Sequence, residues 1–344
     1  MKPVRVLVVD DSSTIRHLLT ATLERDPEIE VVGGAPEPSV ARRMIRELNP
    51  DVITLDVEMP NMNGLEFLEK IMRLRPMPVV MVSTLTQRGA EVTLEALELG
   101  AVDYHAKPTE NVANALEASA RELGAKVKAA ARANVRPYEP RAPASEPDAD
   151  YVPADKIVAI GSSTGGVEAL IEVLSHFPVN CPPTVIAQHM PARFITTFAE
   201  RLDRLCRPKV TEAYEGAPLV PGNVYLAPGG EAHMQISRRG NSRCHLHAGD
   251  TVSGHRPSVD VLFASVADQA GAAGVGILLT GMGRDGATGL KAMRDAGAVT
   301  IGQDEASSTV YGMPKVAFEI GAVGRQMPLR RIGEEIVRLC KASR

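Results

Sequence analysis

Residues 157–166, IVAIGSSTGG, constrain the fold of this chain more than any other stretch. The apolar start predicts a short buried strand, the glycines predict a tight turn, and the apolar spacing of residues 167–174 predicts a helix. The turn fits the pattern G-x-S-x-G with Ser163 at its centre. Such a turn lifts one hydroxyl to a strand end, beside helix-opening N–H groups that can hold an oxyanion. The turn alone is also compatible with phosphate binding, or with no ligand.

Length and composition narrow the class of protein. At 344 residues the chain is expected to form two domains, taking roughly 150 residues per domain. A net charge of −4, no Trp, six Tyr and six Phe argue against nucleic-acid binding. No apolar run approaches the ~20 residues of a membrane span, so we expect no membrane insertion.

Compartment can also be predicted from the sequence. The first apolar run ends directly in two aspartates, which is unlike a secretory signal. The four cysteines are far apart and show no C-x-x-C spacing, so we expect free thiols rather than a disulfide framework or a metal cage. These features predict a cytoplasmic protein.

Residues 1–122 alternate between predicted strands and predicted helices. The strands are residues 4–9, 30–32, 52–55, 79–82 and 102–105, and the helices between them are residues 15–24, 40–48, 64–73 and 90–99. This alternation predicts a doubly wound parallel α/β sheet, whose functional groups collect at the carboxyl ends of the strands.

Polar residues follow four of these five strands. Asp10 and Asp11 follow the first strand, Asp56 the third, Ser83 the fourth and Lys107 the fifth. Any one of them could simply end a buried strand, but that explanation accounts poorly for all five at one edge. Three converging carboxylates repel one another unless a divalent cation lies among them, and oxygen ligands suit Mg²⁺.

The motifs VLVVDDS, LDVEMPNMNG, MVS and KP, in this order, resemble the receiver domain of bacterial response regulators across nearly all of residues 1–122. The resemblance implies a flavodoxin-like fold in which Asp56 accepts a phosphoryl group from a histidine kinase. It also implies that Mg²⁺ is held by Asp10, Asp11, Asp56 and a backbone carbonyl, that of Glu58. A carboxylate that attacks phosphorus needs such a metal to neutralise developing charge.

The same resemblance implies roles for three further residues. Ser83 and Lys107 would contact the phosphoryl oxygens, and Tyr104 would stand at the switching aromatic position. The sequence departs from the family pattern at Pro36-Glu37-Pro38, where a small polar turn is more usual. This departure puts the shape of that loop in doubt.

Residues 123–154 are predicted to link two domains. The Ala-, Glu- and Lys-rich residues 112–131 indicate a last helix that continues past the first domain, although Gly124 weakens the prediction of one continuous helix. Four prolines within residues 136–150 then preclude regular structure and predict a stiff, solvated tether.

Residues 155–344 are predicted to form a second α/β domain with a parallel sheet. Besides the strand before Ser163, we expect strands at 183–188, 275–280 and 299–301, shorter β segments at 224–226, 232–236 and 244–247, and helices at 194–205, 258–266 and 287–296. Three residues of this domain, Ser163, His189 and Asp285, each follow a predicted buried strand. A serine hydroxyl needs an imidazole to take its proton, and the imidazole needs a carboxylate to hold its tautomer. The chain order Ser, His, Asp is not that of α/β-hydrolases.

Other histidines compete for the role of base. His255 lies in HRPSVD, where Asp260 is a possible orienting acid, and the spacing leaves His189 and His255 both open. His233, His245 and His247 are close in sequence, but no cysteine or carboxylate clearly completes a zinc site. A nucleotide-binding Rossmann enzyme is disfavoured, since GSSTGG lacks the spacing G-x-G-x-x-G.

The motifs IGSSTGG, QHMP, HRPSVDVLF, ILLTGMGRDG and YGMPK resemble, in order, the catalytic domain of the chemotaxis methylesterases, the CheB family. A receiver followed by this Rossmann-like three-layer α/β domain matches the whole architecture of that family. The resemblance implies Ser163 as nucleophile, His189 as base and Asp285 as orienting acid. It places Thr164 and Met282 at the site, with the Met282 N–H as an oxyanion donor, and implies a supporting role for His255.

The resemblance further implies a phosphorylation-activated enzyme of chemotaxis. It would hydrolyse γ-glutamyl methyl esters on the cytoplasmic helices of methyl-accepting chemoreceptors, releasing methanol, and would deamidate particular receptor glutamines. The esterase step needs no cofactor, so Mg²⁺ belongs to the receiver. Two alternatives are the same chemistry on a receptor of a parallel chemosensory pathway, and a non-enzymatic response regulator whose second domain only binds a partner.

Overall fold

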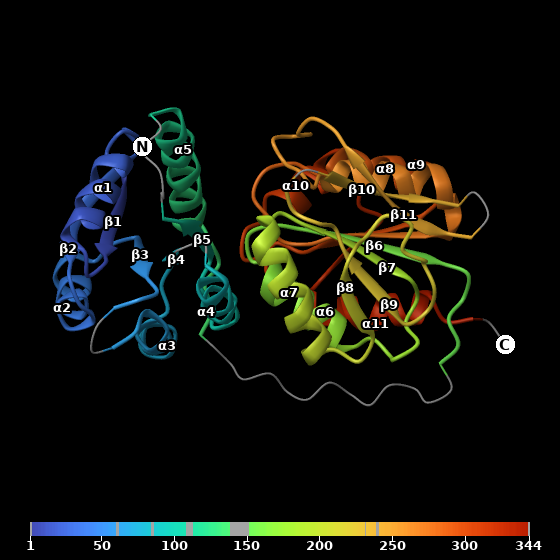
Figure 1. Ribbon diagram of the computed structural model, residues 1–344, viewed down its shortest axis with the longest axis horizontal. Helices are drawn as coiled ribbons and strands as arrows, with labels where there is room; N and C mark the ends of the chain where they lie inside the picture. Colours follow the sequence, from blue (N-terminus) through green and yellow to red (C-terminus); the bar gives the residue numbers. More distant parts are fainter. Residues whose placement is uncertain are drawn as a thin grey trace. The chain divides into compact units, whose positions relative to one another are not determined.

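The protein folds into two compact units, Met1–Pro140 and Arg141–Arg344 (Figure 1). The computed structural model describes residues 2–59, 62–83, 86–107, 113–137, 151–230, 232–238 and 241–342. Most of the predicted Pro-rich tether, residues 138–150, lies outside these described residues. Within them, no helix combines the length and the apolar character that crossing a membrane requires.

The first unit contains a five-stranded parallel sheet in the order β2-β1-β3-β4-β5, which confirms the predicted doubly wound, flavodoxin-like fold. Its strands are β1 (Val4–Val9), β2 (Ile29–Ala35), β3 (Val52–Asp56), β4 (Val79–Ser83) and β5 (Asp103–Ala106). Its helices are α1 (Ser13–Leu23), α2 (Pro38–Leu48), α3 (Gly64–Leu74), α4 (Gln87–Glu98) and α5 (Ala113–Ala130). Helix α1 contacts α5, and α3 contacts α4 (Figure 1).

Helix caps explain where the helices of this unit begin. The side chains of Ser12, Asn63 and Thr86 accept backbone N–H groups at the starts of α1, α3 and α4. Pro38, in the loop that departs from the family pattern, is the first residue of α2, where its missing N–H costs nothing. Helix α5 continues through Gly124, so the predicted helical extension is one continuous helix as far as Ala130.

The second unit contains a seven-stranded sheet in the order β14-β13-β12-β6-β7-β9-β8, and every pair in it is parallel. Its strands are β6 (Ile157–Ser162), β7 (Thr184–Gln188), β8 (Lys209–Glu212), β9 (Asn223–Leu226), β12 (Gly274–Leu278), β13 (Val299–Gln303) and β14 (Arg325–Met327). Strands β10 (Ala232–Ser237) and β11 (Arg243–Ala248) form a separate antiparallel hairpin.

Helices cover both faces of this sheet, which makes the unit a three-layer α/β fold as predicted. Figure 1 shows α8 (Val259–Ala270), α9 (Ala287–Asp295) and α10 (Met313–Glu319) on one side. Helices α6 (Gly166–Ser175), α7 (Ala192–Leu205) and α11 (Leu329–Leu339) lie on the other. The sequence patterns did not predict β8, β14, α10 or α11. Strands β8 and β14 are short edge strands of four and three residues in which only Val210 of β8 is buried, so they lack the apolar run that marks the central strands.

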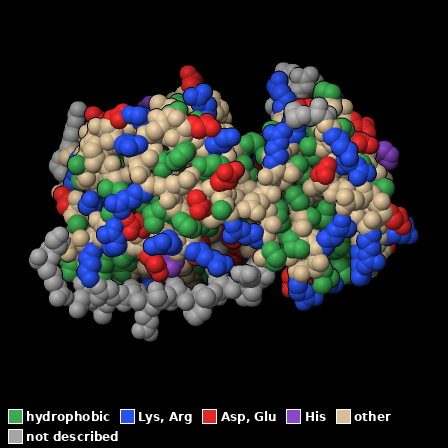
Figure 2. All heavy atoms as spheres, turned by 180° about the vertical axis from the view of Figure 1, so that it is seen from behind, with side chains coloured by type: hydrophobic (Ala, Val, Ile, Leu, Met, Phe, Trp, Pro, Cys, Tyr) green, Lys and Arg blue, Asp and Glu red, His purple; other side chains and the backbone are tan. Residues whose placement is uncertain are grey.

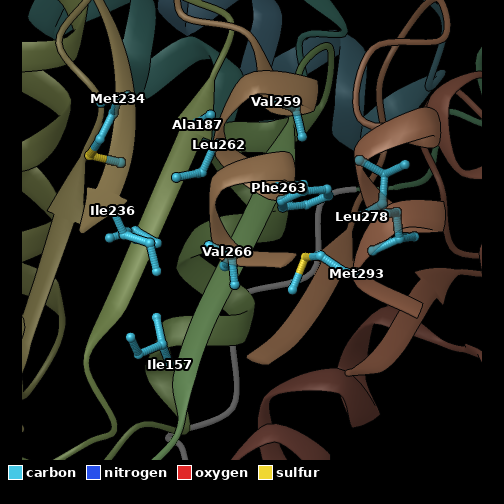
Figure 3. Close-up of a cluster of buried hydrophobic side chains, with 14 of the residues drawn as sticks. Ile157, Ala187, Met234, Ile236, Val259, Leu262, Phe263, Val266, Leu278 and Met293 are labelled. Carbon is cyan, nitrogen blue, oxygen red and sulfur yellow. The ribbon is translucent and has the colours of Figure 1, made fainter. Parts of the chain in front are cut away.

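The core of the second unit brings α8 and α9 against the centre of the sheet. Figure 3 shows Phe263 of α8 among side chains of β6, β12 and α9, and α8 also packs on the hairpin strand β10. A Cβ atom at Gly161 of β6 would lie 2.2 Å from Cγ1 of Val259, so only glycine lets the start of α8 approach the sheet this closely. This close approach sets the position of the N-terminus of α8 at the sheet's carboxyl edge.

Charged side chains of both signs lie on the face that Figure 2 shows. Lys and Arg side chains are interspersed with Asp and Glu over the face shown there. This mixture agrees with the small net charge of −4.

Replacing Phe263 with Ala tests the packing of α8. Phe263 is completely buried, so we expect Phe263→Ala to lower the free energy of unfolding of the second unit by about 3–5 kcal/mol. Phe318 is 52% exposed, and Phe318→Ala is the matched control, with an expected change within about 0.5 kcal/mol. Urea unfolding of the full chain followed by circular dichroism measures both, and equal losses would contradict the packing of Phe263.

Candidate functional site

Three neighbouring strands of the second unit carry the predicted triad residues at their carboxyl ends. Ser163 follows β6 and His189 follows β7, while Asp285 lies in the loop between β12 and α9. The backbone joins these ends, because the His189 N–H donates to the Ser162 carbonyl at 3.2 Å and the Ser163 N–H donates to the Thr280 carbonyl at 3.0 Å. The parallel order β12-β6-β7 therefore places all three residues at one edge of one sheet.

His189 and Asp285 form a direct pair. Nε2 of His189 lies 2.8 Å from Oδ2 of Asp285, and the Asp285 side chain is 1% exposed. A carboxylate can only accept a hydrogen bond, so Nε2 is the nitrogen that carries the proton. In the neutral imidazole, Nδ1 then holds the lone pair that can accept a proton. Nδ1 is buried and has no hydrogen-bond partner among the described residues, so the Ser163 hydroxyl does not donate to it in this structure.

Asp285 is surrounded by hydrogen-bond donors. Besides His189, its carboxylate accepts the Ser258 hydroxyl at 2.8 Å and the backbone N–H groups of Val259 at 2.7 Å, Asp260 at 3.0 Å and Gly286 at 3.1 Å. The N–H groups of Val259 and Asp260 open α8, where the helix dipole favours a negative charge. Burial by itself would raise the pKa of Asp285, but the His189 pair and these N–H groups outweigh it and lower the pKa to about 2.

The turn that carries Ser163 is as tight as its glycines predict. Gly165 has φ +77°, in the left-handed region that favours glycine. Gly281 must also lack a side chain, since a Cβ atom there would lie 2.8 Å from Cβ of Ser163 and 2.3 Å from Sδ of Met313. Thr164 is buried, and its carbonyl accepts the Thr280 hydroxyl at 3.0 Å. Met282 is half-buried in the loop after Gly281.

His255 lies directly on the His189 ring. The two ring centroids are 3.6 Å apart and the planes are inclined by 7°, so the rings stack. A tight turn presents His255 there, with reciprocal backbone hydrogen bonds of 3.0 Å between Val252 and His255. Asp260, the other half of the rival pair, instead accepts the Gly289 N–H at 2.7 Å. The carboxylate of the site is therefore bound to His189, and His255 covers the face of its ring.

The remaining histidines of the hairpin region have structural contacts. His233 is buried, and its Nδ1 accepts the Ser258 N–H at 3.1 Å while Nε2 lies 2.8 Å from the Asp250 carbonyl. His245 is exposed and pairs with Glu215 at 3.0 Å, and His247 is exposed as well. Among the described residues, the geometry of a metal site occurs at Asp10, Asp11 and Asp56 and not at these histidines.

The predicted acidic site forms at the carboxyl edge of the first unit's sheet. Ligand atoms of Asp10, Asp11 and Asp56 all lie within 4.8 Å of one another. Asp10 and Asp56 are buried and Asp11 is exposed. Nζ of Lys107 lies 3.0 Å from Oδ2 of Asp10 and 2.7 Å from Oδ2 of Asp56.

The charges of the acidic site are not balanced by the side chains around it. Burial raises the pKa of Asp56 to about 6; Lys107 opposes the rise and the charge of Asp10 adds to it. For Lys107, burial would lower the pKa, but the two carboxylates more than offset this and raise it. One lysine therefore does not balance the buried carboxylates. Their oxygen donors and their excess negative charge fit a divalent cation such as Mg²⁺.

The other predicted residues of the first unit lie around this site. The Glu58 N–H donates to Oδ1 of Asp56 at 3.3 Å. Ser83 is the buried last residue of β4, and its carbonyl accepts the Lys107 N–H at 2.7 Å. Tyr104 on β5 is buried, with Nζ of Lys126 lying 5.0 Å from its ring centroid.

Sequence reasoning missed three residues that shape the triad. Gln188, Ser258 and Thr280 are buried, and each forms hydrogen bonds to the triad residues or to their neighbours. Their positions at strand ends and at a helix start could have identified these residues from the sequence. Gln188 and Thr280 are polar residues at strand ends, and Ser258 precedes a helix whose first turn faces Asp285.

Fold and site together define a response regulator whose output domain is an α/β unit with a serine, a histidine and an aspartate at one sheet edge. Residues 6–118 match the family model for the response regulator receiver domain, and residues 158–336 match that for CheB methylesterase. The chain belongs to the CheB methylesterase family.

Individual relatives support this assignment over the full length. The chain is 63% identical, across 100% of both chains, to "Protein-glutamate methylesterase/protein-glutamine glutaminase 1" of Caulobacter vibrioides. It is 59% identical to a protein of Agrobacterium fabrum with the same enzyme name, over 98% of this chain and 97% of that one. The crystal structure of the Thermotoga maritima CheB methylesterase catalytic domain matches with a TM-score of 0.52 and 36% identity, covering 55% of this chain and 100% of that one.

Asp285→Asn tests the electrostatics of the triad. Because the pKa of Asp285 is lowered from 3.8 to about 2, its charge stabilises the fold above its ordinary pKa, and this contribution is lost as the pH falls through 2. The wild type should therefore lose about 2 kcal/mol of its stability advantage over Asp285→Asn between about pH 5 and about pH 2. Urea unfolding at stepped pH measures this, and a difference that does not change with pH would contradict it.

His255→Ala tests the stacked ring. An aromatic pair contributes about 0.5–1.5 kcal/mol, so loss of the ring face over His189 should lower kcat about 2- to 10-fold. His255→Phe keeps a ring face and should retain most of the rate. If both variants lose activity equally, stacking is not the role of His255.

Proposed function

We propose that this protein is a phosphorylation-activated protein-glutamate methylesterase and protein-glutamine glutaminase that acts on methyl-accepting chemoreceptors. The observation that carries the proposal is the buried His189–Asp285 pair at 2.8 Å, at the same sheet edge as Ser163. The full-length similarity to enzymes of this name supports the substrate class. The roles of Ser163 as nucleophile, His189 as base and Asp285 as orienting acid are part of the proposal.

The first half of the reaction forms an acyl-enzyme. Nδ1 of His189 takes the proton of Ser163 as Oγ attacks the glutamyl carbonyl carbon. The carbonyl oxygen becomes an oxyanion, for which the Met282 N–H is the proposed donor, beside the buried Thr164. Asp285 stabilises the imidazolium of His189, and its low pKa keeps it ionised while it does so.

The second half releases the product. His189 returns its proton to the leaving group as the bond to the carbonyl carbon breaks, giving methanol from an ester or ammonia from a glutamine side chain. Water then attacks the acyl carbonyl carbon while His189 takes its proton, and His189 returns this proton to Oγ of Ser163 as the acyl bond breaks, which gives glutamate and free Ser163. Both substrates pass through the same kind of tetrahedral intermediate, so one triad serves both activities, with water as the only other reactant.

The receiver provides control in this proposal. Asp56 is the proposed acceptor of a phosphoryl group from a histidine kinase, with Lys107 and Ser83 contacting the phosphoryl oxygens. Asp10, Asp11, Asp56 and the Glu58 carbonyl would hold Mg²⁺, which would supply positive charge during phosphoryl transfer. The phosphoryl group adds roughly −1.5 to −2 charges, which redistributes the contacts of Lys107 and repositions Tyr104.

The proposed consequence is a population shift between domain arrangements. Residues 123–154 are proposed as the helix-and-tether segment that permits it, between a receiver of residues 1–122 and a catalytic domain of residues 155–344. We place the enzyme in the cytoplasm, where receptor helices and the kinase meet. A receptor of a parallel chemosensory pathway is the second candidate substrate, since the triad does not encode the substrate surface.

Methanol release from methylated receptor membranes tests the proposal. Wild type, Ser163→Ala and Asp56→Asn are each assayed with and without a small phosphodonor and Mg²⁺. The wild-type rate should rise with the phosphodonor, Asp56→Asn should not respond to it, and Ser163→Ala should lose at least about 10³-fold in rate.

Each departure from this pattern has a distinct meaning. Activity that survives Ser163→Ala would overturn the serine mechanism. A phosphodonor response that survives Asp56→Asn would overturn the site of control. Absence of wild-type methanol release would point to the receptor of a parallel pathway, or to a regulator without enzymatic activity.

A further inference from the structure

The side chain of Gln188 bridges the nucleophile and the base of the triad. Gln188 is the last residue of β7 and is 3% exposed. Its Nε2 donates to the backbone carbonyl of Ser163 at 3.0 Å and to that of His189 at 3.2 Å. We propose that Gln188 is a positioning residue that fixes the spacing of Ser163 and His189. This inference rests on the proposed roles of those two residues.

The hydrogen-bond partners of the Gln188 side-chain amide allow only one of its two possible orientations. Two backbone carbonyls can only accept hydrogen bonds, so the amide must turn its NH₂ group towards them. Its oxygen is then matched by a donor, since the Ser162 hydroxyl lies 2.6 Å from Oε1. All polar atoms of this buried amide are satisfied, and its geometry is determined from both ends.

The need for such a bridge follows from the fold. The parallel register of β6 and β7 ends at Ser162 and Gln188, and the His189 N–H bonded to the Ser162 carbonyl is the next contact along this edge. Ser163 and His189 therefore lie just past the last paired residues of β6 and β7, and the register of these two strands does not extend to a pairing of Ser163 with His189. The Gln188 amide supplies the hydrogen bonds that link the two backbones at that point.

The helix that follows Ser163 is shaped around this side chain. A Cβ atom at Gly166, the first residue of α6, would lie 2.1 Å from Oε1 of Gln188. The Gly166 N–H also donates to the Ser163 carbonyl at 2.7 Å, so this carbonyl accepts from the helix start and from Gln188. Gln188 thus connects the base to the same turn that aims the nucleophile.

Two variants separate positioning from general stability. Gln188→Met keeps the length of the side chain and removes both donors, while Gln188→Glu keeps the shape and turns an oxygen towards the two carbonyls. Thr184→Val is the matched control. Thr184 is buried at the opposite end of β7, and its hydroxyl donates to the Pro182 carbonyl at 2.8 Å, away from the triad.

The main readout is a split between kcat and KM. We expect Gln188→Met to lower kcat for methanol release about 10- to 100-fold, because a small misplacement of reacting groups costs that much, with KM changed less than about 2-fold. The rate at which a fluorophosphonate probe labels Ser163 should fall in parallel, without any receptor present. Thr184→Val should lower the melting temperature of the full chain and leave kcat and labelling unchanged.

The pH dependence of Gln188→Glu provides a second, independent readout. A buried carboxyl beside two carbonyls favours its protonated form, which has one O–H to donate. The ratio of the variant's kcat to that of the wild type should therefore rise as the pH falls, whereas the ratio for Gln188→Met should stay flat. If Gln188→Met does not fold, the pH dependence of the kcat ratio of Gln188→Glu to wild type still tests the proposal.

Four outcomes distinguish a failure of the positioning role of Gln188 from a failure of the proposed serine mechanism. Normal kcat and normal labelling in a folded Gln188→Met would overturn the positioning role, as would a flat pH ratio for Gln188→Glu. Equal kcat losses in Gln188→Met and Thr184→Val would also overturn it, because stability alone would then explain both. Ser163→Ala run alongside tests the serine mechanism itself, and activity in that variant would refute the proposed function rather than the role of Gln188.

Discussion

A buried carboxylate at the start of a helix organises the second unit. The Asp285 side chain is 1% exposed, and a charge buried to this degree is tolerated only with several donors around it. The first N–H groups of α8 and the Ser258 hydroxyl supply most of them. Helix α8 must therefore begin against the sheet edge, and Gly161 removes the Cβ atom that would prevent it. His189 uses the carboxylate that this packing fixes.

The pKa values of the buried aspartates are shifted in opposite directions in the two units. Both place their acids at the carboxyl edge of a parallel sheet, where strand ends converge. In the second unit, N–H groups surround Asp285 and its pKa falls to about 2, so it remains an anion that orients His189. In the first unit, burial raises the pKa of Asp56 to about 6, since Lys107 alone does not balance it and Asp10. The charge of Asp285 is balanced by groups of the chain itself, whereas the acidic site of the first unit suits an added cation.

Much of this could be predicted from the sequence because the relevant signals are local. Apolar runs that end in glycine or in polar residues predicted the strands that carry Asp10, Asp56, Ser163 and His189. Short edge strands such as β8 were not predicted, since four residues with a single buried side chain leave no clear pattern. The choice between His189 and His255 also stayed open in the sequence, because spacing along the chain does not say which imidazole reaches a carboxylate.

The sequence by itself determined the types of residue at the strand ends, the two α/β units and the family, since each depends on short motifs read in order. The tertiary structure decided which groups meet. The Asp285 carboxylate is buried at the N-terminus of α8, where it pairs with His189, and His255 stacks on the imidazole ring of His189. The tertiary structure also turned Gln188 from a polar end of a strand into a bridge between Ser163 and His189. These pairings depend on the order of strands across the sheet, a property of the folded chain that no local stretch of sequence encodes.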